Sequence, residues 1–305
     1  MLKKRLISST IIISFLLVLV AIDLTLGSDA WLARPGLMLA PVLLLVIALT
    51  AKELTDLFAA FPIRPAVSVV IFATLLAVGF ACAPMAWRDY PDDCPIGKSG
   101  WTMFGLAAAV GLIFVHEMLR YREPGQSITR ISLSVLAVIY LGLLASFLPA
   151  LRLFHSNQWG MAALMSMIVV TKISDVGAYT AGKMFGKRKL SPRLSPNKTV
   201  EGAVGAFVFG CLASVLMFLL LFPWLVGEPN TTPLWAMLVY GVVVISAGML
   251  GDLAESLLKR DAQQKDSSRW LPGLGGALDV LDSVLVAAPA AFACWVSGLV
   301  GPLAG

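Results

Sequence analysis

The feature that most constrains this 305-residue chain is a near-continuous series of long apolar stretches. A helix that spans a lipid bilayer needs ~20 predominantly apolar residues. Stretches of about this length occur at residues 6–26, 37–57, 66–86, 101–119, 131–151, 160–181, 203–226, 234–256 and 284–304. We therefore expect an all-α protein, a polytopic transmembrane helical bundle of about nine spans.

The composition excludes the common soluble classes. Hydrophobic residues make up 58% of the chain and charged residues only 13%, whereas a soluble globular domain carries about 25% charged residues. Disordered, collagen-like and coiled-coil chains do not fit this composition either. The four cysteines are scattered without metal-ligand spacing, so we expect no disulfide framework, redox motif or zinc site.

Basic residues are distributed unevenly among the predicted loops. Eighteen of the 23 Lys and Arg residues lie in loops on the side of the N-terminus, and four lie on the opposite side. The positive-inside rule then predicts a cytoplasmic N-terminus and explains the net charge of +5 without a nucleic-acid partner. The first apolar stretch is longer than the ~7–15 residues of a signal-peptide core and lacks a cleavage pattern, so we expect a retained first helix.

We divide the chain into N-terminal transmembrane helices, residues 1–160, and a C-terminal catalytic transmembrane region with cytoplasmic motif loops, residues 161–305. In the first region, Asp23 lies at the end of a span, where water is near, so we expect a structural role for it.

Three predicted helices of the second region carry ionisable residues at helical spacing on one face. They are Lys172, Asp175 and Tyr179 in the sixth span, Asp252, Glu255, Ser256 and Lys259 in the eighth, and Asp279 and Asp282 in the segment that leads into the ninth. Charges within a bilayer are costly and usually face a partner or a water-filled cavity. Carboxylates near basic loops favour Mg²⁺ holding a polyphosphate. For Lys172 and Asp175, a simple intramembrane salt bridge explains the pattern equally well.

Two long motifs occur in order in this region. The first comprises Ser174–Tyr179, Gly182, Phe185–Lys187 and Ser195–Gly202, and the second comprises Ser256–Asp266 and Leu271–Asp282. Together they resemble the motifs of the phosphatidate cytidylyltransferases, also called CDP-diacylglycerol synthases. The resemblance is specific over roughly residues 170–285, and the N-terminal half matches only as a series of hydrophobic spans.

The resemblance implies a nucleotidyltransferase of phospholipid biosynthesis that converts CTP and phosphatidate into CDP-diacylglycerol and pyrophosphate, with Mg²⁺ as cofactor. It implies that Asp252, Asp279 and Asp282 are catalytic metal ligands and that Lys259 is catalytic. The substrate-binding residues that it implies are Asp175, Tyr179, Ser195, Asn197, Lys198, Thr199, Ser256, Arg260, Lys265, Asp266, Gly275 and Gly276. It also implies a multi-pass protein of the cell (inner) membrane whose active site faces the cytoplasm, and it is compatible with a homodimer.

The sequence departs from the family pattern at two positions. Leu274 stands where the family motif has His, and Val280 stands where it has Arg. Three alternatives stay open. A CTP-dependent transferase acting on another lipid phosphate fits because the chain has no readable headgroup selector. A catalytically impaired family member would explain these two departures, and a secondary transporter would explain many helices with charges near the middle of the membrane. Charges that cluster toward the cytoplasmic ends of the helices, without a repeated half, argue against the transporter.

Overall fold

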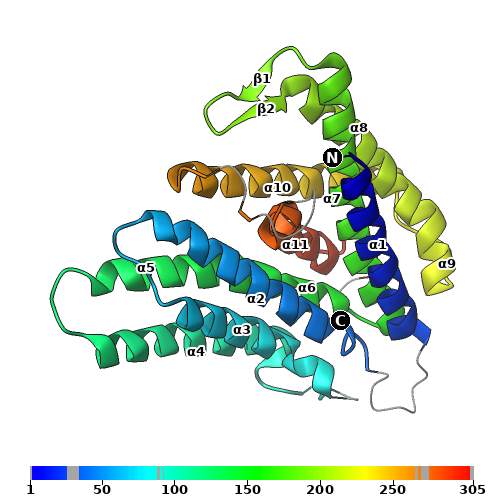
Figure 1. The fold of residues 1–305 in the computed structure, drawn as a ribbon. Helices are drawn as coiled ribbons and strands as arrows, with labels where there is room; N and C mark the ends of the chain where they lie inside the picture. The colour runs from blue at the N-terminus through cyan, green and yellow to red at the C-terminus, as the bar shows by residue number, and fades with distance from the viewer. Residues whose placement is uncertain are drawn as a thin grey trace. The chain divides into compact units, whose positions relative to one another are not determined.

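The computed structural model describes residues 2–25, 34–87, 90–91, 93–264, 267–268 and 275–302. Within these ranges the chain is a helical bundle of the membrane-protein type, with one short antiparallel hairpin (Figure 1). It forms two compact units, one of Met1–Leu153 with Asp261–Leu281 and the other of Phe154–Arg260 with Asp282–Gly305. The predicted domain boundary at residue 160 stays a prediction.

The helices of the first unit occupy the N-terminal half of the chain. They are α1 (Leu2–Thr25), α2 (Leu39–Leu57), α3 (Val67–Cys82), α4 (Gly97–Arg120), α5 (Ser127–Ala137) and α6 (Phe147–Arg152). Short 3-10 turns extend α2 and α3, and a π turn, η3 (Val138–Leu143), follows α5 directly.

The second unit contains the longest helices and the hairpin. Its elements are α7 (Asn157–Phe185), β1 (Lys189–Ser191), β2 (Ser195–Thr199), α8 (Val200–Leu216), the π turn η4 (Met217–Leu221), α9 (Phe222–Val226) and α10 (Leu234–Asp261). The last helix, α11 (Ala277–Val296), starts in the residues of the first unit and continues into those of the second.

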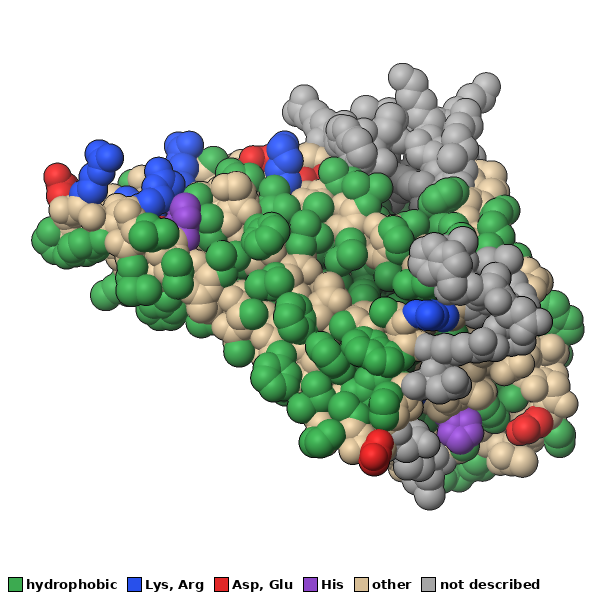
Figure 2. Space-filling model, turned by 90° about the horizontal axis from the view of Figure 1, so that it is seen from below, with side chains coloured by type: hydrophobic (Ala, Val, Ile, Leu, Met, Phe, Trp, Pro, Cys, Tyr) green, Lys and Arg blue, Asp and Glu red, His purple; other side chains and the backbone are tan. Residues whose placement is uncertain are grey.

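Seven helical segments in the described ranges are long and apolar enough to cross a membrane. They are Val67–Ala86, Gly97–Arg120, Ser127–Arg152, Asn157–Phe185, Val200–Val226, Leu234–Asp261 and Ala277–Val296. Figure 2 shows a face on which hydrophobic side chains predominate, while charged side chains lie mainly toward its margins. Of the two other predicted spans, the one at 37–57 contains α2, Leu39–Leu57, which carries Lys52, Glu53 and Asp56, and the one at 6–26 overlaps α1, Leu2–Thr25. The count of nine spans therefore stays a prediction.

Small residues set the helix packing in the first unit. Ala73 and Ala77 of α3 and Ala109 of α4 belong to one buried cluster that also includes Val138. A Cβ atom on Gly105 of α4 would lie only 2.8 Å from the carbonyl oxygen of Ala77. Small side chains at such positions let transmembrane helices approach closely and gain van der Waals contact.

The same principle joins α7 and α8 in the second unit. A Cβ atom on Gly177 would lie 2.6 Å from both the carbonyl oxygen of Gly205 and the Cβ atom of Phe209, and Gly205 in turn faces Ala181 and the backbone of Gly177. The two glycines therefore allow the backbones of α7 and α8 to touch, and this contact fixes the direction in which α7 presents its polar face.

We expect Gly177→Val to destabilise the protein, because the added methyl groups would overlap the α8 backbone. Overpacking of this kind costs about 1–3 kcal/mol, and the thermal unfolding temperature in detergent micelles measures it. Gly79→Ala is the matched control, since a Cβ atom on Gly79 of α3 has no atom within 4 Å. An unchanged unfolding temperature for Gly177→Val would contradict the close α7–α8 contact.

The hairpin continues directly into α8. β1 and β2 pair antiparallel, with Lys189 opposite Thr199 and Ser191 opposite Ser195. The Thr199 side chain caps α8 by accepting a hydrogen bond from the backbone N–H of Gly202 at 3.1 Å. The carboxylate of Glu201 accepts the backbone N–H of Lys187 at 3.0 Å, which holds the start of the hairpin against the first turn of α8.

The prediction for the last span was wrong in its bounds. A span at 284–304 was expected, whereas α11 runs from Ala277 to Val296. The apolar count excluded the first turns because they contain Asp279 and Asp282. In the structure Asp279 is a helix-capping residue: its Oδ2 accepts the backbone N–H of Gly276 at 2.7 Å, the contact made by an acidic residue in the first helical turn of a capping box. The two aspartates therefore lie within the helix, one turn apart.

Candidate functional site

An acidic cluster lies where α10 meets α11 in the second unit. One carboxylate oxygen from each of Asp252, Glu255 and Asp282 lies within 4.8 Å of the other two. Glu255 is 1% exposed and Asp282 7% exposed. Gly251 allows this approach, because a Cβ atom there would overlap the backbone oxygen of Asp282. Three carboxylates are thus held together on two apolar helices.

Two lysines partly neutralise the cluster. Lys198, on β2, places its Nζ 2.6 Å from Oδ2 of Asp252. Lys259, one turn after Glu255 on α10, places its Nζ 2.6 Å from Oε2 of that residue. The cluster therefore combines anionic oxygens, suited to a hard divalent cation, with ammonium groups suited to phosphate.

The polar face of α7 adjoins the same α11 turn. Nζ of Lys172 lies 3.3 Å from Oδ2 of Asp175 and donates to the hydroxyl of Ser283 at 3.0 Å, and that hydroxyl lies 3.3 Å from the Asp175 carboxylate. The backbone N–H of Ser283 donates to Oδ1 of Asp282 at 2.5 Å. The sequence left a salt bridge and a functional group as alternatives for Lys172 and Asp175. The ion pair is present, and through Ser283 it lies next to the acidic cluster.

Other predicted site residues have different surroundings. Tyr179 is 58% exposed and has Nζ of Lys183 5.8 Å from its ring centre. Asn197 is exposed on β2, and Thr199 is buried as the cap of α8. Arg260 donates from Nε to the backbone oxygen of Leu194 at 3.1 Å, which ties the end of α10 to the hairpin.

Positions of the second motif fall partly outside the described residues. Lys265, Asp266 and Leu274 lie outside them. Gly275 has a φ of +91°, a left-handed conformation that favours glycine, and Gly276 donates its N–H to Asp279. Ser256 is 9% exposed on α10.

Asp279 has its described partners in the first unit. Besides Gly276, its Oδ2 accepts the hydroxyl of Ser267 at 2.8 Å and the backbone N–H of the same residue at 3.3 Å. The three predicted metal carboxylates therefore divide into Asp252 and Asp282, in the acidic cluster of the second unit, and Asp279, which caps α11 in the first.

Two acidic residues were missed as site candidates. Glu255 was placed on the polar face of its helix but not assigned to the metal, although its spacing from Asp252 and Lys259 contained the signal. Glu53 was not singled out at all. Its carboxylate is 6% exposed and accepts hydrogen bonds from four groups around the start of α11. Its signal was an acidic residue near the end of a predicted span.

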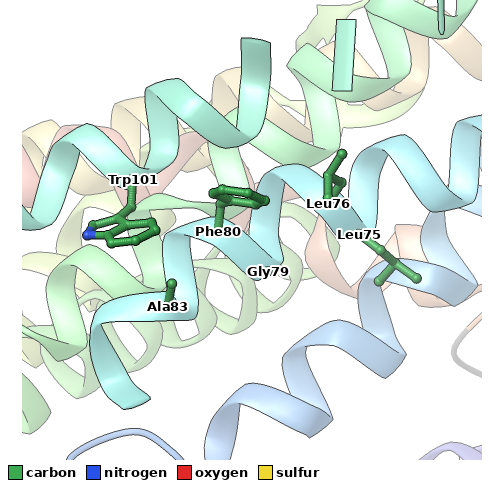
Figure 3. A pocket seen from close by; sticks show the side chains of 6 residues that line it. All are labelled: Leu75, Leu76, Gly79, Phe80, Ala83 and Trp101. Atoms are coloured by element: carbon green, nitrogen blue, oxygen red, sulfur yellow. The ribbon is translucent and has the colours of Figure 1, made fainter. Parts of the chain in front are cut away.

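A pocket in the first unit does not have the chemistry of a phosphate site. It has a volume of about 370 Å³ and is lined by Leu75, Leu76, Gly79, Phe80, Ala83 and Trp101 (Figure 3). The rings of Phe80 and Trp101 lie 6.2 Å apart, and the indole N–H of Trp101 donates to the hydroxyl of Tyr90 at 2.9 Å. This lining is apolar and offers no charged group to an anionic ligand.

The donor set of the acidic cluster fits Mg²⁺. Magnesium prefers carboxylate oxygens at about 2.1 Å, so two oxygens on one ion lie at most roughly 4.2 Å apart. The oxygens of Asp252, Glu255 and Asp282, within 4.8 Å of one another, need to move by less than about 1 Å to meet this requirement. Ion pairs with Lys198 and Lys259 offset part of the negative charge of the cluster.

Comparisons with known proteins find phosphatidate cytidylyltransferases among the proteins similar to this chain. A phosphatidate cytidylyltransferase of Mycobacterium leprae is 38% identical over 218 residues, which is 68% of this chain and 65% of that protein. The protein of the same name from Mycobacterium bovis is 37% identical over 174 residues, 57% of this chain and 52% of that protein. The one from Haemophilus influenzae is 36% identical over 135 residues, 44% of this chain and 46% of that protein.

In these alignments the chain spans about half the length of most of the curated relatives that it matches. The sequence model of the Cytidylyltransferase family, however, matches residues 3–297, nearly the whole chain. On that match, the chain belongs to the cytidylyltransferase family.

Proposed function

We propose that this protein is a phosphatidate cytidylyltransferase, which converts CTP and phosphatidate into CDP-diacylglycerol and pyrophosphate. The observation that carries the proposal is the acidic cluster of Asp252, Glu255 and Asp282 with Lys198 and Lys259, held by apolar helices in a member of the cytidylyltransferase family. The names of its curated relatives supply the substrate class.

In the proposed reaction a phosphate oxygen of phosphatidate attacks the α-phosphorus of CTP. A new P–O bond forms, the bond from the α-phosphorus to the oxygen that bridges it to the β-phosphorus breaks, and pyrophosphate leaves with that electron pair. Transfers of this kind depend on positioning and charge neutralisation rather than on a covalent nucleophile. Charged groups held in fixed positions supply both.

Carboxylates and lysines would contribute differently to positioning and charge neutralisation. Asp252, Glu255 and Asp282 would hold Mg²⁺, with Asp279 added by the family resemblance. A bound magnesium ion stabilises negative charge on the phosphate oxygens. Lys198 and Lys259, released from their carboxylate partners, would bind phosphate oxygens as ammonium donors. Lys198 is well placed for this, because the hairpin carries it to Asp252 from outside the helices.

The remaining assignments come from the family motifs. Ser195, Asn197, Thr199 and Ser256 would line the nucleotide site, and Arg260, Lys265 and Asp266 would border the phosphates. Gly275 and Gly276 would allow close approach of the backbone to the ligand, and Asp175 and Tyr179 would line the site from α7.

The proposed setting is a multi-pass protein of the cell (inner) membrane with nine spans, a cytoplasmic N-terminus and an active site that faces cytoplasmic CTP. The excess of basic residues in one set of loops supports this orientation. The acyl chains of phosphatidate would remain in the bilayer while the phosphate reaches the cluster. A homodimer stays an expectation from the family resemblance.

A transfer assay tests the proposal. The purified full chain, in detergent or in lipid nanodiscs, is given CTP labelled at the α-phosphate, phosphatidic acid and Mg²⁺, and label in the lipid fraction is measured. We expect labelled CDP-diacylglycerol only when phosphatidic acid is present. Label transferred to a different lipid phosphate, with none to phosphatidic acid, would contradict the substrate assignment. Absence of transfer by folded, CTP-binding protein would contradict the activity.

Removal of the metal gives a second expected result. Chelation with excess EDTA should abolish the transfer, because three adjacent carboxylates would repel the anionic substrates without a divalent cation. Addition of excess Mg²⁺ to the same sample should restore it. Transfer that is unchanged in EDTA would contradict the metal role of the acidic cluster.

A further inference from the structure

Glu53 joins α2 to the start of α11 in the first unit. Its Oε1 accepts the hydroxyl of Ser268 at 2.7 Å and the backbone N–H of Ala277 at 3.0 Å. Its Oε2 accepts the hydroxyl of Ser267 at 3.2 Å and the backbone N–H of Leu278 at 2.9 Å. One buried carboxylate thus binds groups more than 210 residues away in the sequence.

These bonds complete the cap of α11. The first backbone N–H groups of a helix have no partner within the helix. Asp279 accepts the N–H of Gly276, and Glu53 accepts those of Ala277 and Leu278. The start of α11 is therefore defined jointly by a residue of its own first turn and by a residue of α2.

The carboxylate of Glu53 is closely packed against Gly276 and Ser267. A Cβ atom on Gly276 would overlap both the hydroxyl of Ser267 and the carboxylate of Glu53. Ser267 itself donates to both Glu53 and Asp279. The two carboxylates share this hydroxyl, so a shift of Glu53 would also disturb the partners of Asp279.

We propose that Glu53 is a positioning residue for the cytidylyl transfer. It holds the α11 cap, defined here as Ser267, Ser268 and Gly276–Asp279, and so sets the orientation of Asp279. The inference rests on the proposed function, because it assigns Glu53 a role in that same reaction. Glu53 has no direct contact with the reacting atoms in this role and acts through the residues that it holds.

Two variants of Glu53 remove different numbers of its hydrogen bonds. Glu53→Ala removes all four hydrogen bonds. Glu53→Gln keeps one oxygen but presents an NH₂ group in place of the other, and each oxygen of Glu53 accepts a backbone N–H. The amide group must therefore face one N–H donor without accepting from it, so Glu53→Gln should be intermediate. Asp56→Asn is the matched control, since Asp56 lies on the same helix, is exposed and pairs only with Lys52 among its described partners.

The first readout is amide hydrogen exchange of the full chain in nanodiscs, which needs no activity. We expect exchange at Ala277 and Leu278 to accelerate by roughly ten- to hundredfold in Glu53→Ala, because their buried N–H groups lose their acceptors. Exchange in α3 and α4 should be unchanged. Asp56→Asn should behave as the wild type throughout, and unchanged exchange at Ala277 and Leu278 in Glu53→Ala would overturn the inference.

The second readout is the kinetics of labelled CMP transfer to phosphatidic acid. We expect kcat per folded molecule to fall by roughly 10- to 100-fold in Glu53→Ala, as for other residues that orient a ligand, with a smaller fall in Glu53→Gln and little change in KM for phosphatidate. A purely structural role would lower the unfolding temperature and leave kcat per folded molecule intact, which would overturn the inference. If the wild type transfers no label, the proposed function fails; if it does and Glu53→Ala matches it, only the role of Glu53 fails.

Discussion

Asp282→Asn is expected to lower the rate of CDP-diacylglycerol formation by roughly 10²- to 10³-fold, the range seen when one fixed electrostatic group of an active site is removed. The amide keeps the oxygen that accepts the N–H of Ser283, so the fold should persist. It removes the charge that, with Asp252 and Glu255, suits the cluster to a divalent cation. The measurement is label transfer at saturating CTP, together with the unfolding temperature in the same detergent.

The control for this variant is Glu228→Gln, the same chemical change on an exposed residue of the loop between α9 and α10. It should leave both activity and stability unchanged. The concentration of Mg²⁺ that gives half of the maximal rate should rise in Asp282→Asn and stay constant in Glu228→Gln. Full activity of Asp282→Asn at the same Mg²⁺ concentration would refute a metal role for the cluster.

Asp279→Asn distinguishes capping from metal binding. One amide oxygen can still accept the N–H of Gly276, so the cap of α11 should be largely retained. Loss of turnover in a variant of normal stability would then support the metal role that the family motif implies. Normal turnover would assign Asp279 to the cap and leave the metal to Asp252, Glu255 and Asp282.

The sequence predicted most of the long helices because each is a single apolar run with polar ends. The predicted span at 160–181, for example, lies within α7, Asn157–Phe185. The sequence prediction failed at the start of α11, where Asp279 accepts a hydrogen bond from a backbone N–H of the helix start. A hydropathy count scores Asp279 only as a charged residue, so it excluded this turn from the span. The hairpin β1–β2 was expected only as a motif loop, because strands of three and five residues are too short to show a periodicity.

The part of the candidate site that lies on a single helix was predictable from the sequence. Asp252, Glu255 and Lys259 share a face of α10 by spacing alone. Their meeting with Asp282 depends on the packing of α10 on α11 at Gly251, which no local pattern encodes. The hydrogen bonds of Glu53 cross more than 200 residues of sequence, so its place near the end of a predicted span gave no indication of its partners. Asp23 was expected near water, but it is buried in the first unit.

Asp23→Ala is expected to produce the largest loss of stability. Oδ2 of Asp23 lies 2.5 Å from Nη2 and 2.9 Å from Nε of Arg152, and its carboxylate also accepts the backbone N–H of Gly36 at 3.0 Å. Both side chains are at most 2% exposed. Removal of one partner of a buried ion pair costs about 3–5 kcal/mol, because Arg152 would lose its ion pair with Asp23 while its charge stays buried. The unfolding temperature of the full chain in detergent micelles measures this loss.

The exposed pair of Lys52 and Asp56 provides the comparison, since its side chains are 62% and 55% exposed at a separation of 3.3 Å. Its removal in Lys52→Gln should cost at most about 1 kcal/mol.

A double variant separates the two costs of losing Asp23. Asp23→Leu with Arg152→Met removes both charges together and should recover much of the loss, because well-packed apolar residues often replace a buried ion pair at no cost. Recovery should remain incomplete by about 1–3 kcal/mol, the cost of the Gly36 N–H that then has no acceptor. If Asp23→Ala alone were as stable as the wild type, the ion pair of Asp23 and Arg152 would contribute nothing to the stability of the protein. A double variant no more stable than Asp23→Ala would instead place the whole cost in the bond to Gly36.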